Sequence, residues 1–560
     1  MTAAMGGGNA KGEVPLSCFL FVVVAFATVG AILFGLDQGN WAGAIEKPNF
    51  IKAFCNDTLP SLDPSREWDC EDPELLPAYY KSFLAWGSSL VQLGAFFGAV
   101  ILGPPIAGHA GRREAMFVGC LITVMGVIPM CLFTLPNIFM ASRFLAGVGV
   151  GVVTYALPMF IAEVSPPQIR GTLGSAFQLL MVSGMIVASL LNTQSWFGYR
   201  ASFSLPVYPA IVMCMGIFCF PQSPRFTLVK AYRHGKQAEG EEQALASLTL
   251  LRGSKKAAQT ELLDLKKTME SEEEEAPWST LFRDPSIRRR VLIANSLQWM
   301  QQFTGINALL SYGPSMLKAA KLEMDIEVAQ FIINVVNLGG TIFMMFAIDR
   351  YGRRPLMLAG SSIMMVFMCL SAVIAWQMKA YQRELEALQS PGLNVSARML
   401  SAGFNMSATS VTGAATLEPP AGPFGIHLGT CLLFCLCGYI MAFGIGWGGV
   451  CWVYPSEIFP MDVKEKALST SVGSQWLANF LIAFIVPYQV SALGLSGTFV
   501  FYASCLLCIS IAVFFLVPET KGLPMEEMDN LFGPRLGQKE ERSTDESQEE
   551  SASEDEESSS

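Results

Sequence analysis

The apolar residues of this chain come in unbroken blocks of about twenty, such as 16–36 and 356–377, rather than at a regular spacing. A block of that length can cross a hydrocarbon layer about 30 Å thick as a helix. Because the blocks recur along the whole chain, we predict an all-α membrane protein with twelve transmembrane helices. The predicted spans are 16–36, 84–107, 115–135, 138–160, 173–194, 200–220, 291–315, 327–348, 356–377, 426–453, 468–490 and 497–517.

The composition fits this prediction. Hydrophobic residues make up 52% of the 560 and charged residues only 15%, whereas soluble domains carry about 25% charged residues. The net charge of −10 comes largely from the end of the chain and from Glu272 to Glu275, and no basic patch suggests nucleic acid. We read the acidic, Ser-rich tail as disordered; it has either no specific role or one in regulation by phosphorylation. No catalytic dyad or metal-spaced cluster appears, so we expect no enzyme activity, cofactor or metal.

The loop charges predict the orientation. An even number of spans puts both termini on one side, and short basic loops mark the cytosolic side. We therefore expect cytosolic segments at 1–15, 221–290 and 518–560, and external loops at 38–82 and 378–425. The basic residues that decide this are Arg112, Arg113, Arg170, Arg288 to Arg290, Arg350, Arg353, Arg354, Lys464 and Lys466.

The predicted external loops carry the glycosylation sequons of the chain outside the spans, at Asn56, Asn394 and Asn405. Cys55 and Cys70 fall in the first of these loops. In an oxidising space they form either a disulfide or two free thiols.

Segment 221–290 separates six spans (16–220) from six (291–517). Leucines at helical spacing within 241–251 and 261–269 predict two short amphipathic helices under the bundle. They act either as a latch on the cytosolic side or as a packed linker.

The two halves repeat each other. A Gly-Arg-Arg sequence follows spans 2 and 8, an acid ends spans 4 and 10 with a base seven residues later, and a Pro-rich sequence follows spans 6 and 12. Two pseudo-symmetric six-helix bundles imply a binding site between them at mid-membrane. The charged repeats then form either a cytosolic gate or simple topology signals. The repeated residues are Gly111-Arg112-Arg113 and Gly352-Arg353-Arg354, Glu163 with Arg170 and Glu457 with Lys464, and 221–225 and 518–522.

Asp37 and Arg143 are charged residues within or directly beside predicted spans, where an unpaired charge is costly. Asp37 lies in the outer part of span 1 and Arg143 begins span 4. A pair between them would satisfy both, either as a static ion pair or as a carboxylate that takes up and releases a proton when the pair breaks. The histidines, His109, His234 and His427, are poorly placed for that role.

Amides and tryptophans populate the other spans. Amides both donate and accept hydrogen bonds, so a group of them beside an indole face suits a neutral polyhydroxylated ring, although single amides also hold helices together. Glycines in spans 4 and 10 permit close helix contact or bending. The amides and tryptophans are Gln178, Gln298, Gln301, Gln302, Asn307, Asn334, Asn337, Trp452, Trp476 and Asn479, and the glycines are Gly147, Gly149, Gly151, Gly444, Gly446, Gly448 and Gly449.

These motifs, in this order, resemble the sugar porter family of the major facilitator superfamily over residues 16–532. The resemblance rests on Leu33-Phe34-Gly35-Leu36-Asp37, Gly111-Arg112-Arg113, Arg143 with its glycines, residues 301–308, residues 349–354, Pro455-Ser456-Glu457 and residues 518–522.

The resemblance implies several roles. Asp37 with Arg143 would couple transport to protons, Tyr312 would be an outer gate, and the long first loop would be a lid closed by Cys70, for which Cys55 is the better partner here. The glycines Gly448 and Gly449, together with the charged clusters, would complete the gates. The implied sugar contacts are Phe34, Gln178, Gln301, Gln302, Asn307, Asn337 and Trp452; the charged gate residues are Arg112, Arg113, Glu163, Arg170, Arg353, Arg354 and Glu457.

Four positions depart from the family pattern. Gly108 stands in place of an Asp, Gln222 in place of a Glu, Lys464-Glu465 in place of Arg-Gly, and Gly449 in place of a Pro. We expect the first three to thin the cytosolic clamp and Gly449 to soften the gate, which would favour the inward-open state.

The leading hypothesis is a monosaccharide/proton symporter of the plasma membrane that acts as a monomer in the lipid bilayer, with a hexose such as glucose as substrate. A facilitative uniporter that uses the same residues is the rival hypothesis. A non-transporting sugar sensor is the alternative from another class.

Overall fold

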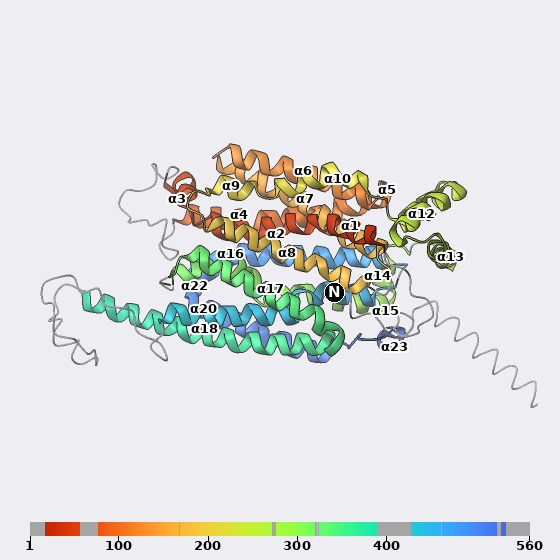
Figure 1. The fold of residues 1–560 in the computed structure, drawn as a ribbon. Coiled ribbons are helices and arrows are strands. Elements are labelled where there is room, and N and C mark those ends of the chain that lie inside the picture. The colour runs from red at the N-terminus through yellow and green to blue at the C-terminus, as the bar shows by residue number, and fades with distance from the viewer. Residues whose placement is uncertain are drawn as a thin grey trace, which may run out of the picture.

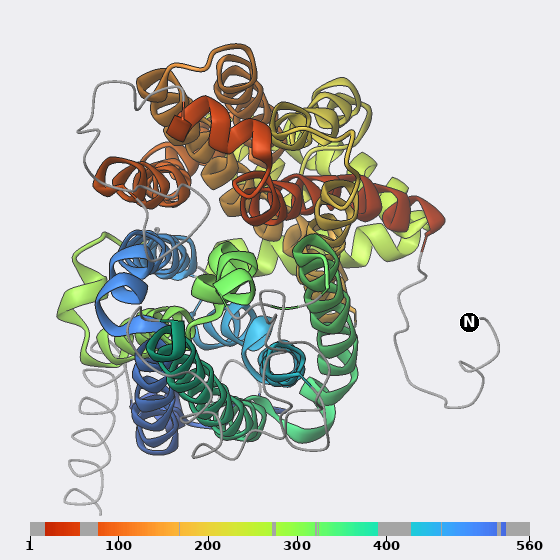
Figure 2. The same cartoon turned by 90° about the vertical axis from the view of Figure 1, so that its left-hand side faces the viewer.

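The computed structural model describes residues 17–56, 77–166, 169–271, 276–319, 322, 324–389, 427–460, 462–523 and 528–533. Figure 1 shows helices running side by side in two layers, with the N-terminal half above and the C-terminal half below. Figure 2 views these layers along the helices, from the end where α3 lies. Arg112 and Arg353 are the first residues of helices that begin at the opposite end. We call that end the basic end and the end with α3 the outer end.

The N-terminal bundle contains the first six spans. Its elements are α1 (Cys18–Ala27), α2 (Val29–Ala44), α3 (Pro48–Ile51), a π-helical turn (Lys52–Asn56), α4 (Ala78–Phe97), a second π-helical turn (Gly98–Leu102), α5 (Gly103–His109), α6 (Arg112–Leu132), α7 (Pro136–Val164), α8 (Arg170–Asn192), α9 (Tyr199–Ser204), α10 (Val207–Gly216) and a 3₁₀ turn (Ile217–Cys219).

The linker folds into helices at the basic end, beside both bundles (Figure 1). They are α11 (Pro224–Arg233), α12 (Gln237–Arg252), α13 (Lys255–Ser271) and α14 (Thr280–Arg283). α12 and α13 contain the two predicted amphipathic helices. Arg252, which is buried, donates to both carboxylate oxygens of Glu261 at 2.6 and 2.7 Å and to the Val164 carbonyl at 2.9 Å. This contact fastens the helix pair to the end of α7.

The C-terminal bundle contains the last six spans. Its elements are α15 (Pro285–Phe303), α16 (Ile306–Ala319), α17 (Ile326–Tyr351), α18 (Arg353–Gln389), α20 (Leu428–Phe443), a π-helical turn (Gly444–Gly448), α21 (Val450–Ile458), α22 (Lys464–Leu516) and the short α23 (Met528–Phe532).

The described helices give the twelve predicted spans. Nine are long and apolar enough to cross a membrane. One of them, α22, holds two spans, because Gly494 has the non-helical angles φ 69° and ψ 176°. The eleventh is α8, whose apolar part is Ala176–Asn192. The twelfth consists of α15 and α16, whose many amides keep its hydropathy low.

The predicted first external loop, 38–82, is too long. α2 continues to Ala44 and α4 begins at Ala78, because Trp41 and Ala44 are buried among the helices of the N-terminal bundle. The predicted loop 378–425 also starts later, since α18 runs to Gln389. Cys55 is disulfide-bonded. Its predicted partner Cys70 and the sequons' Asn394 and Asn405 lie outside the described residues.

The glycines of span 4 bring backbones together, as predicted. A Cβ on Gly147 would lie 2.1 Å from the Val91 carbonyl oxygen, and one on Gly151 would lie 2.2 Å from the Ala95 carbonyl oxygen. α4 and α7 therefore pack backbone to backbone, which holds Arg143 of α7 next to α4.

Candidate functional site

A buried ion pair lies inside the N-terminal bundle. Arg143 Nη1 is 3.4 Å from Asp37 Oδ1, and the two side chains are 2% and 3% exposed. Arg143 Nε donates to the Gly87 carbonyl at 3.0 Å, and its guanidinium lies 4.7 Å from the Trp41 ring centroid and 5.5 Å from that of Phe203. The predicted pair thus forms. The second oxygen of Asp37, Oδ2, has no hydrogen-bond partner, so this carboxylate has room for a proton.

The predicted amides of span 7 meet at a break in the helix. We expected one continuous helix over 291–315, but it is interrupted at Thr304 and Gly305. Gly305 has φ +92° and lies against the Tyr502 ring, where a Cβ would be 2.8 Å from the nearest ring atom. Because of the break, Asn307 donates to Gln302 across five residues of chain.

Gln301 is the most connected of these amides. Its Nε2 donates to the Trp447 carbonyl at 2.9 Å and to the Gly448 carbonyl at 3.4 Å. Its Oε1 accepts from Gln475 Nε2 at 2.6 Å. Gln301 therefore links span 7 to the π-helical turn of span 10 and to span 11. Gln298, one turn before it, donates to the Cys451 carbonyl at 2.9 Å.

Side chains from α8 and α17 complete the cluster. A Cβ on Gly448 would lie 3.7 Å from Gln178 Nε2, so α8 approaches the glycine turn that Gln301 binds. Asn334 donates to the Met185 carbonyl of α8 at 3.4 Å. Asn337, also on α17, is 2% exposed.

Two tryptophans contribute ring faces from the C-terminal bundle. The Trp476 ring packs edge-on against Phe34 with centroids 5.2 Å apart, and the Trp452 ring lies 6.1 Å from that of Phe177. Both contacts cross from one bundle to the other.

Many of these buried groups lack a hydrogen-bond partner. An unpaired buried polar group costs about 1–3 kcal/mol, so it needs a donor or acceptor from elsewhere. Trp476 Nε1 is such a donor. The acceptors are the side-chain amide oxygens of Gln92, Gln178, Gln298, Asn334, Asn337, Gln475 and Asn479. Buried acceptors in this number suit a ligand rich in hydroxyl groups.

The bundles are joined by polar contacts at the outer end. The hydroxyls of Tyr312 and Ser88 are 2.6 Å apart, and the Tyr312 hydroxyl donates at 3.3 Å to the Ala483 carbonyl. Ser88 directly follows Gly87, whose carbonyl binds Arg143. The ion-paired residue and the predicted outer gate are therefore attached to adjacent residues of α4.

Two ion pairs also cross between the bundles at this end. Glu46 pairs with Lys318 at 3.5 Å and accepts from Ser315 at 2.5 Å. Lys47 pairs with Glu327 at 3.9 Å.

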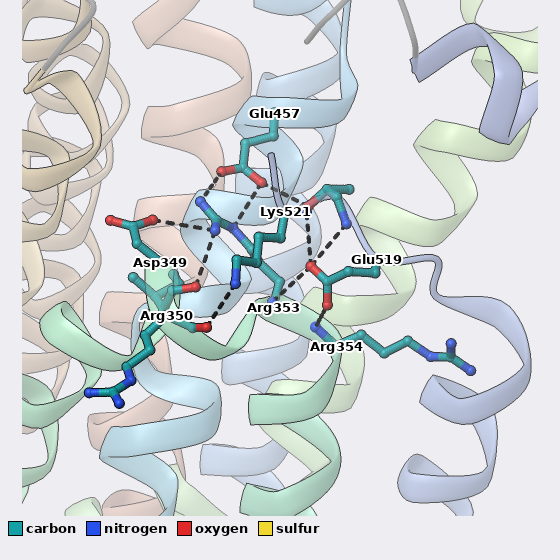
Figure 3. A network of polar contacts seen from close by, with 9 residues as sticks. Asp349, Arg350, Arg353, Arg354, Glu457, Glu519 and Lys521 are labelled. Carbon is teal, nitrogen blue, oxygen red and sulfur yellow. Dashed lines mark hydrogen bonds and ion pairs between the residues drawn. The ribbon is translucent and has the colours of Figure 1, made fainter. Parts of the chain in front are cut away.

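At the basic end, the C-terminal bundle carries a closed network (Figure 3). Arg353 binds Glu457 at 2.6 and 3.2 Å and Asp349 at 3.3 Å. Glu519 accepts from the backbone N–H of Arg353 at 3.0 Å and of Arg354 at 2.9 Å. All of these partners belong to the C-terminal half.

The equivalent charged cluster of the N-terminal bundle also makes a contact with the C-terminal bundle. Arg112 binds Glu163 at 3.0 Å and also pairs with Glu465 of the C-terminal bundle. Gln222 accepts from the Arg113 N–H at 3.5 Å, a longer bond than Glu519 makes in the other half. We expected Lys464-Glu465 to thin the clamp; instead Glu465 gives Arg112 a partner. The Arg170 side chain lies outside the described residues.

Sequence reasoning missed Ser88, Gln92, Glu465 and Gln475. Ser88 and Gln92 are uncharged polar residues in the apolar sequence of span 2, and no repeat marks them. Glu465 was read only as a departure from the family pattern. The proximity of Gln475 to Trp476 and Asn479 was the available signal for including it.

Two helical bundles with buried polar groups between them define a membrane transport protein. The family profile described as Sugar (and other) transporter matches residues 23–420 and 421–532, and the chain belongs to this family.

Curated relatives match over nearly the whole chain. Sugar transport protein 10 of Arabidopsis thaliana is 27% identical over 536 residues, which cover 94% of this chain and 93% of that protein. The low-affinity glucose transporter of Kluyveromyces lactis is 27% identical over 526 residues, 91% of this chain and 81% of that protein.

Solved structures share the fold. The inward-open xylose transporter XylE from E. coli superposes with a TM-score of 0.66 at 23% identity, covering 91% of this chain and 99% of that chain. The proton:xylose symporter XylE bound to 6-bromo-6-deoxy-D-glucose also gives 0.66, at 24% identity and with 92% and 99% covered. The major facilitator fold predicted from the sequence is confirmed.

Proposed function

We propose that the protein is a monosaccharide/proton symporter with a hexose as substrate. One observation carries the proposal: the charges inside the membrane and the free amide acceptors lie in different places. Asp37 and Arg143 pair inside the N-terminal bundle, whereas most of the unpartnered amide oxygens belong to the C-terminal bundle. A neutral polyol fits the amides, and a proton fits the carboxylate.

The geometry suggests how the two sites are coupled. A proton on Asp37 would remove the charge that Arg143 faces. Arg143 would then move relative to the Gly87 carbonyl that it binds at 3.0 Å. Because Ser88 follows Gly87 and bonds Tyr312 of the other bundle, this movement would be transmitted to the outer gate. Sugar and proton would thereby share one closing step.

The names of the relatives support this proposal. They include sugar transport proteins, a glucose transporter and a proton:xylose symporter. We further propose a monomer in the plasma membrane with both termini cytosolic. The charges of the short loops support the orientation of the termini.

The test is uptake of labelled glucose into proteoliposomes with a pH gradient, with and without a protonophore. For one proton per sugar, a gradient of one pH unit supports roughly tenfold accumulation. We expect the purified protein to approach this ratio and the protonophore to abolish it. Asp37→Asn should remove accumulation while retaining exchange of labelled for unlabelled sugar across the membrane.

The two rival hypotheses give other results. Saturable uptake that equilibrates without accumulation, unchanged by Asp37→Asn, would establish a facilitative uniporter. Sugar binding with no flux in either direction would point to the sensor. Neither binding nor flux with any monosaccharide would refute a sugar substrate altogether.

A further inference from the structure

Gln92 lies on α4 one helical turn past Ser88, towards the middle of the membrane. Residues four apart share a helix face, so Gln92 points the same way as Ser88. The Ser88 hydroxyl lies 3.2 Å from the Ala483 carbonyl oxygen of α22. Gln92 therefore faces α22, which belongs to the other bundle.

The register of α4 against α22 is given by contacts on either side of Gln92. Towards the outer end, the rings of Trp86 and Phe484 lie 4.8 Å apart. Towards the basic end, a Cβ on Gly473 would lie 3.5 Å from the ring of Phe96 of α4. The two helices are antiparallel, so each step along α4 matches a step back along α22.

This register places Gln92 level with Asn479, since Ser88 is level with Ala483 and both residues lie four positions further in. Gln92 and Asn479 are 4% and 5% exposed. Neither Gln92 Oε1 nor Asn479 Oδ1 has a hydrogen-bond partner. Trp476, three residues before Asn479, has an unpartnered indole N–H and packs against Phe34.

Buried polar groups without a hydrogen-bond partner thus form a row along α22, from the amides of span 7 to Gln92 of span 2. Gln475 bonds Gln301 at 2.6 Å, Trp476 follows it, and Asn479 lies one turn further along the same helix. Buried acceptors of this kind need donors, and water or a ligand hydroxyl could supply them. We propose that Gln92 accepts a hydrogen bond from one hydroxyl of the bound monosaccharide and so selects among sugars that differ at that carbon.

This inference rests on the proposed function, because it assumes that a monosaccharide binds between the bundles. It adds a contact from span 2 of the N-terminal bundle to the contacts expected from the span-7 glutamines. The N-terminal bundle would then help to choose the sugar as well as carry the proton.

The test compares KM values for glucose and its monodeoxy analogues in the wild type and in Gln92→Leu. In the wild type, we expect the analogue that lacks the hydroxyl bound by Gln92 to have a KM raised roughly two- to tenfold, as for loss of one hydrogen bond. In Gln92→Leu, the KM for glucose should rise to match that analogue, while the penalties for the other analogues persist. Gln92→Glu, which keeps an acceptor, should restore the discrimination.

Ser89→Ala is the matched control. Ser89 is buried on the same helix, but its hydroxyl bonds the Ala85 carbonyl of its own helix at 2.7 Å, so its KM pattern should equal that of the wild type. If Gln92→Leu raises KM by one common factor for every sugar, or leaves all KM values unchanged, Gln92 only packs the helices and the inference is wrong. Should Gln92→Leu fail to fold, Gln92→Asn, which withdraws the amide by one methylene, must show the same selective change. Failure of the wild type to transport any monosaccharide would instead refute the proposed function.

Discussion

The two bundles repeat each other in sequence but divide the polar groups between them. In the N-terminal bundle, a buried acid and base pair with each other: Asp37 and Arg143. In the C-terminal bundle, uncharged amides such as Gln301 and Asn337 are buried near mid-membrane. A duplicated scaffold has therefore kept its helix order while its two interiors acquired different chemistry.

The same contrast appears at the basic end. Arg353 finds Asp349 and Glu457 within its own bundle. The repeat gives Arg112 the equivalent acid Glu163, but Gly108 occupies the place of Asp349. Arg112 instead reaches Glu465 of the other bundle. The N-terminal bundle thus lacks one acidic partner for Arg112, and Arg112 pairs with an acid of the other bundle instead.

The largest expected effect tests whether the sugar contacts of the C-terminal bundle are separate from the ion pair of the N-terminal bundle. Three hydrogen bonds within the protein fix the orientation of the Gln301 side chain. We expect this side chain to make one or two further hydrogen bonds to the sugar, each worth about 0.5–1.5 kcal/mol. Gln301→Ala should therefore raise KM for the transported sugar by roughly ten- to hundredfold. The accumulation ratio in a pH gradient should not change, because Asp37 and Arg143 are untouched.

The control for Gln301→Ala is Gln489→Ala. Gln489 is also a buried amide of the C-terminal bundle, but it lies further along α22 and accepts from the Tyr502 hydroxyl at 3.3 Å. Its KM should stay within about threefold of the wild type. If Gln301→Ala lowers the accumulation ratio as strongly as it raises KM, the separation of proton and sugar sites between the bundles is incorrect.

The next effect concerns the closed network of the C-terminal bundle. Arg353→Ala would leave Glu457 and Asp349 without their shared cation. Because Glu457 is 25% and Arg353 11% exposed, we expect a loss of about 1–3 kcal/mol in stability rather than the full cost of a buried charge. The melting temperature in detergent should fall by several degrees, with or without sugar.

Arg350→Ala provides the comparison. Arg350 lies at the end of α17, directly before α18, which begins at Arg353. Its side chain is exposed and lies over the neighbouring Tyr351 ring at 5.8 Å, so its removal should leave the melting temperature nearly unchanged. Equal melting temperatures for Arg353→Ala and Arg350→Ala would show that the network in Figure 3 adds no stability.

The sequence was sufficient for the features that depend on local pattern or on repetition. Block lengths predicted the twelve spans, and the repeated Gly-Arg-Arg and Glu sequences predicted the charged clusters at the basic end. The Asp37–Arg143 pair followed from the cost of a lone charge in a membrane, which leaves few possible partners.

The features that sequence reasoning missed depend on how helices are rotated and aligned against each other. Whether Gln92 faces lipid or Asn479 depends on the register of α4 against α22, which no local pattern records. The break between Gln302 and Asn307 depends on the packing of Gly305 against Tyr502, about two hundred residues away. Likewise, Glu465 meets Arg112 only after both bundles have folded and closed.

The smallest expected effect tests the contact between the bundles at the basic end. Glu465 is 47% exposed, and exposed ion pairs contribute about 0.2–1 kcal/mol. Glu465→Gln should therefore shift the protein by no more than about fivefold towards the state open at the basic end. The readout is the rate at which a water-soluble maleimide labels a cysteine introduced at Ser469, in a variant that retains only Cys55 and Cys70. Ser469 is buried and lies one turn before Gly473, which faces α4.

Gly108→Asp tests whether Arg112 pairs with Glu465 because the N-terminal bundle lacks the acid that Asp349 provides in the C-terminal bundle. A Cβ on Gly108 would meet no atom within 4 Å, so the new side chain can be accommodated, and it would give Arg112 the partner that Asp349 gives Arg353. Arg112 would then depend less on Glu465, so the change in labelling caused by Glu465→Gln should be smaller in the Gly108→Asp background than in the wild type. An equal change in both backgrounds would mean that the missing acid and the cross-bundle contact are unrelated. No change in either would mean that Glu465 does not hold the bundles together, and the difference between the two charged clusters would then affect stability alone.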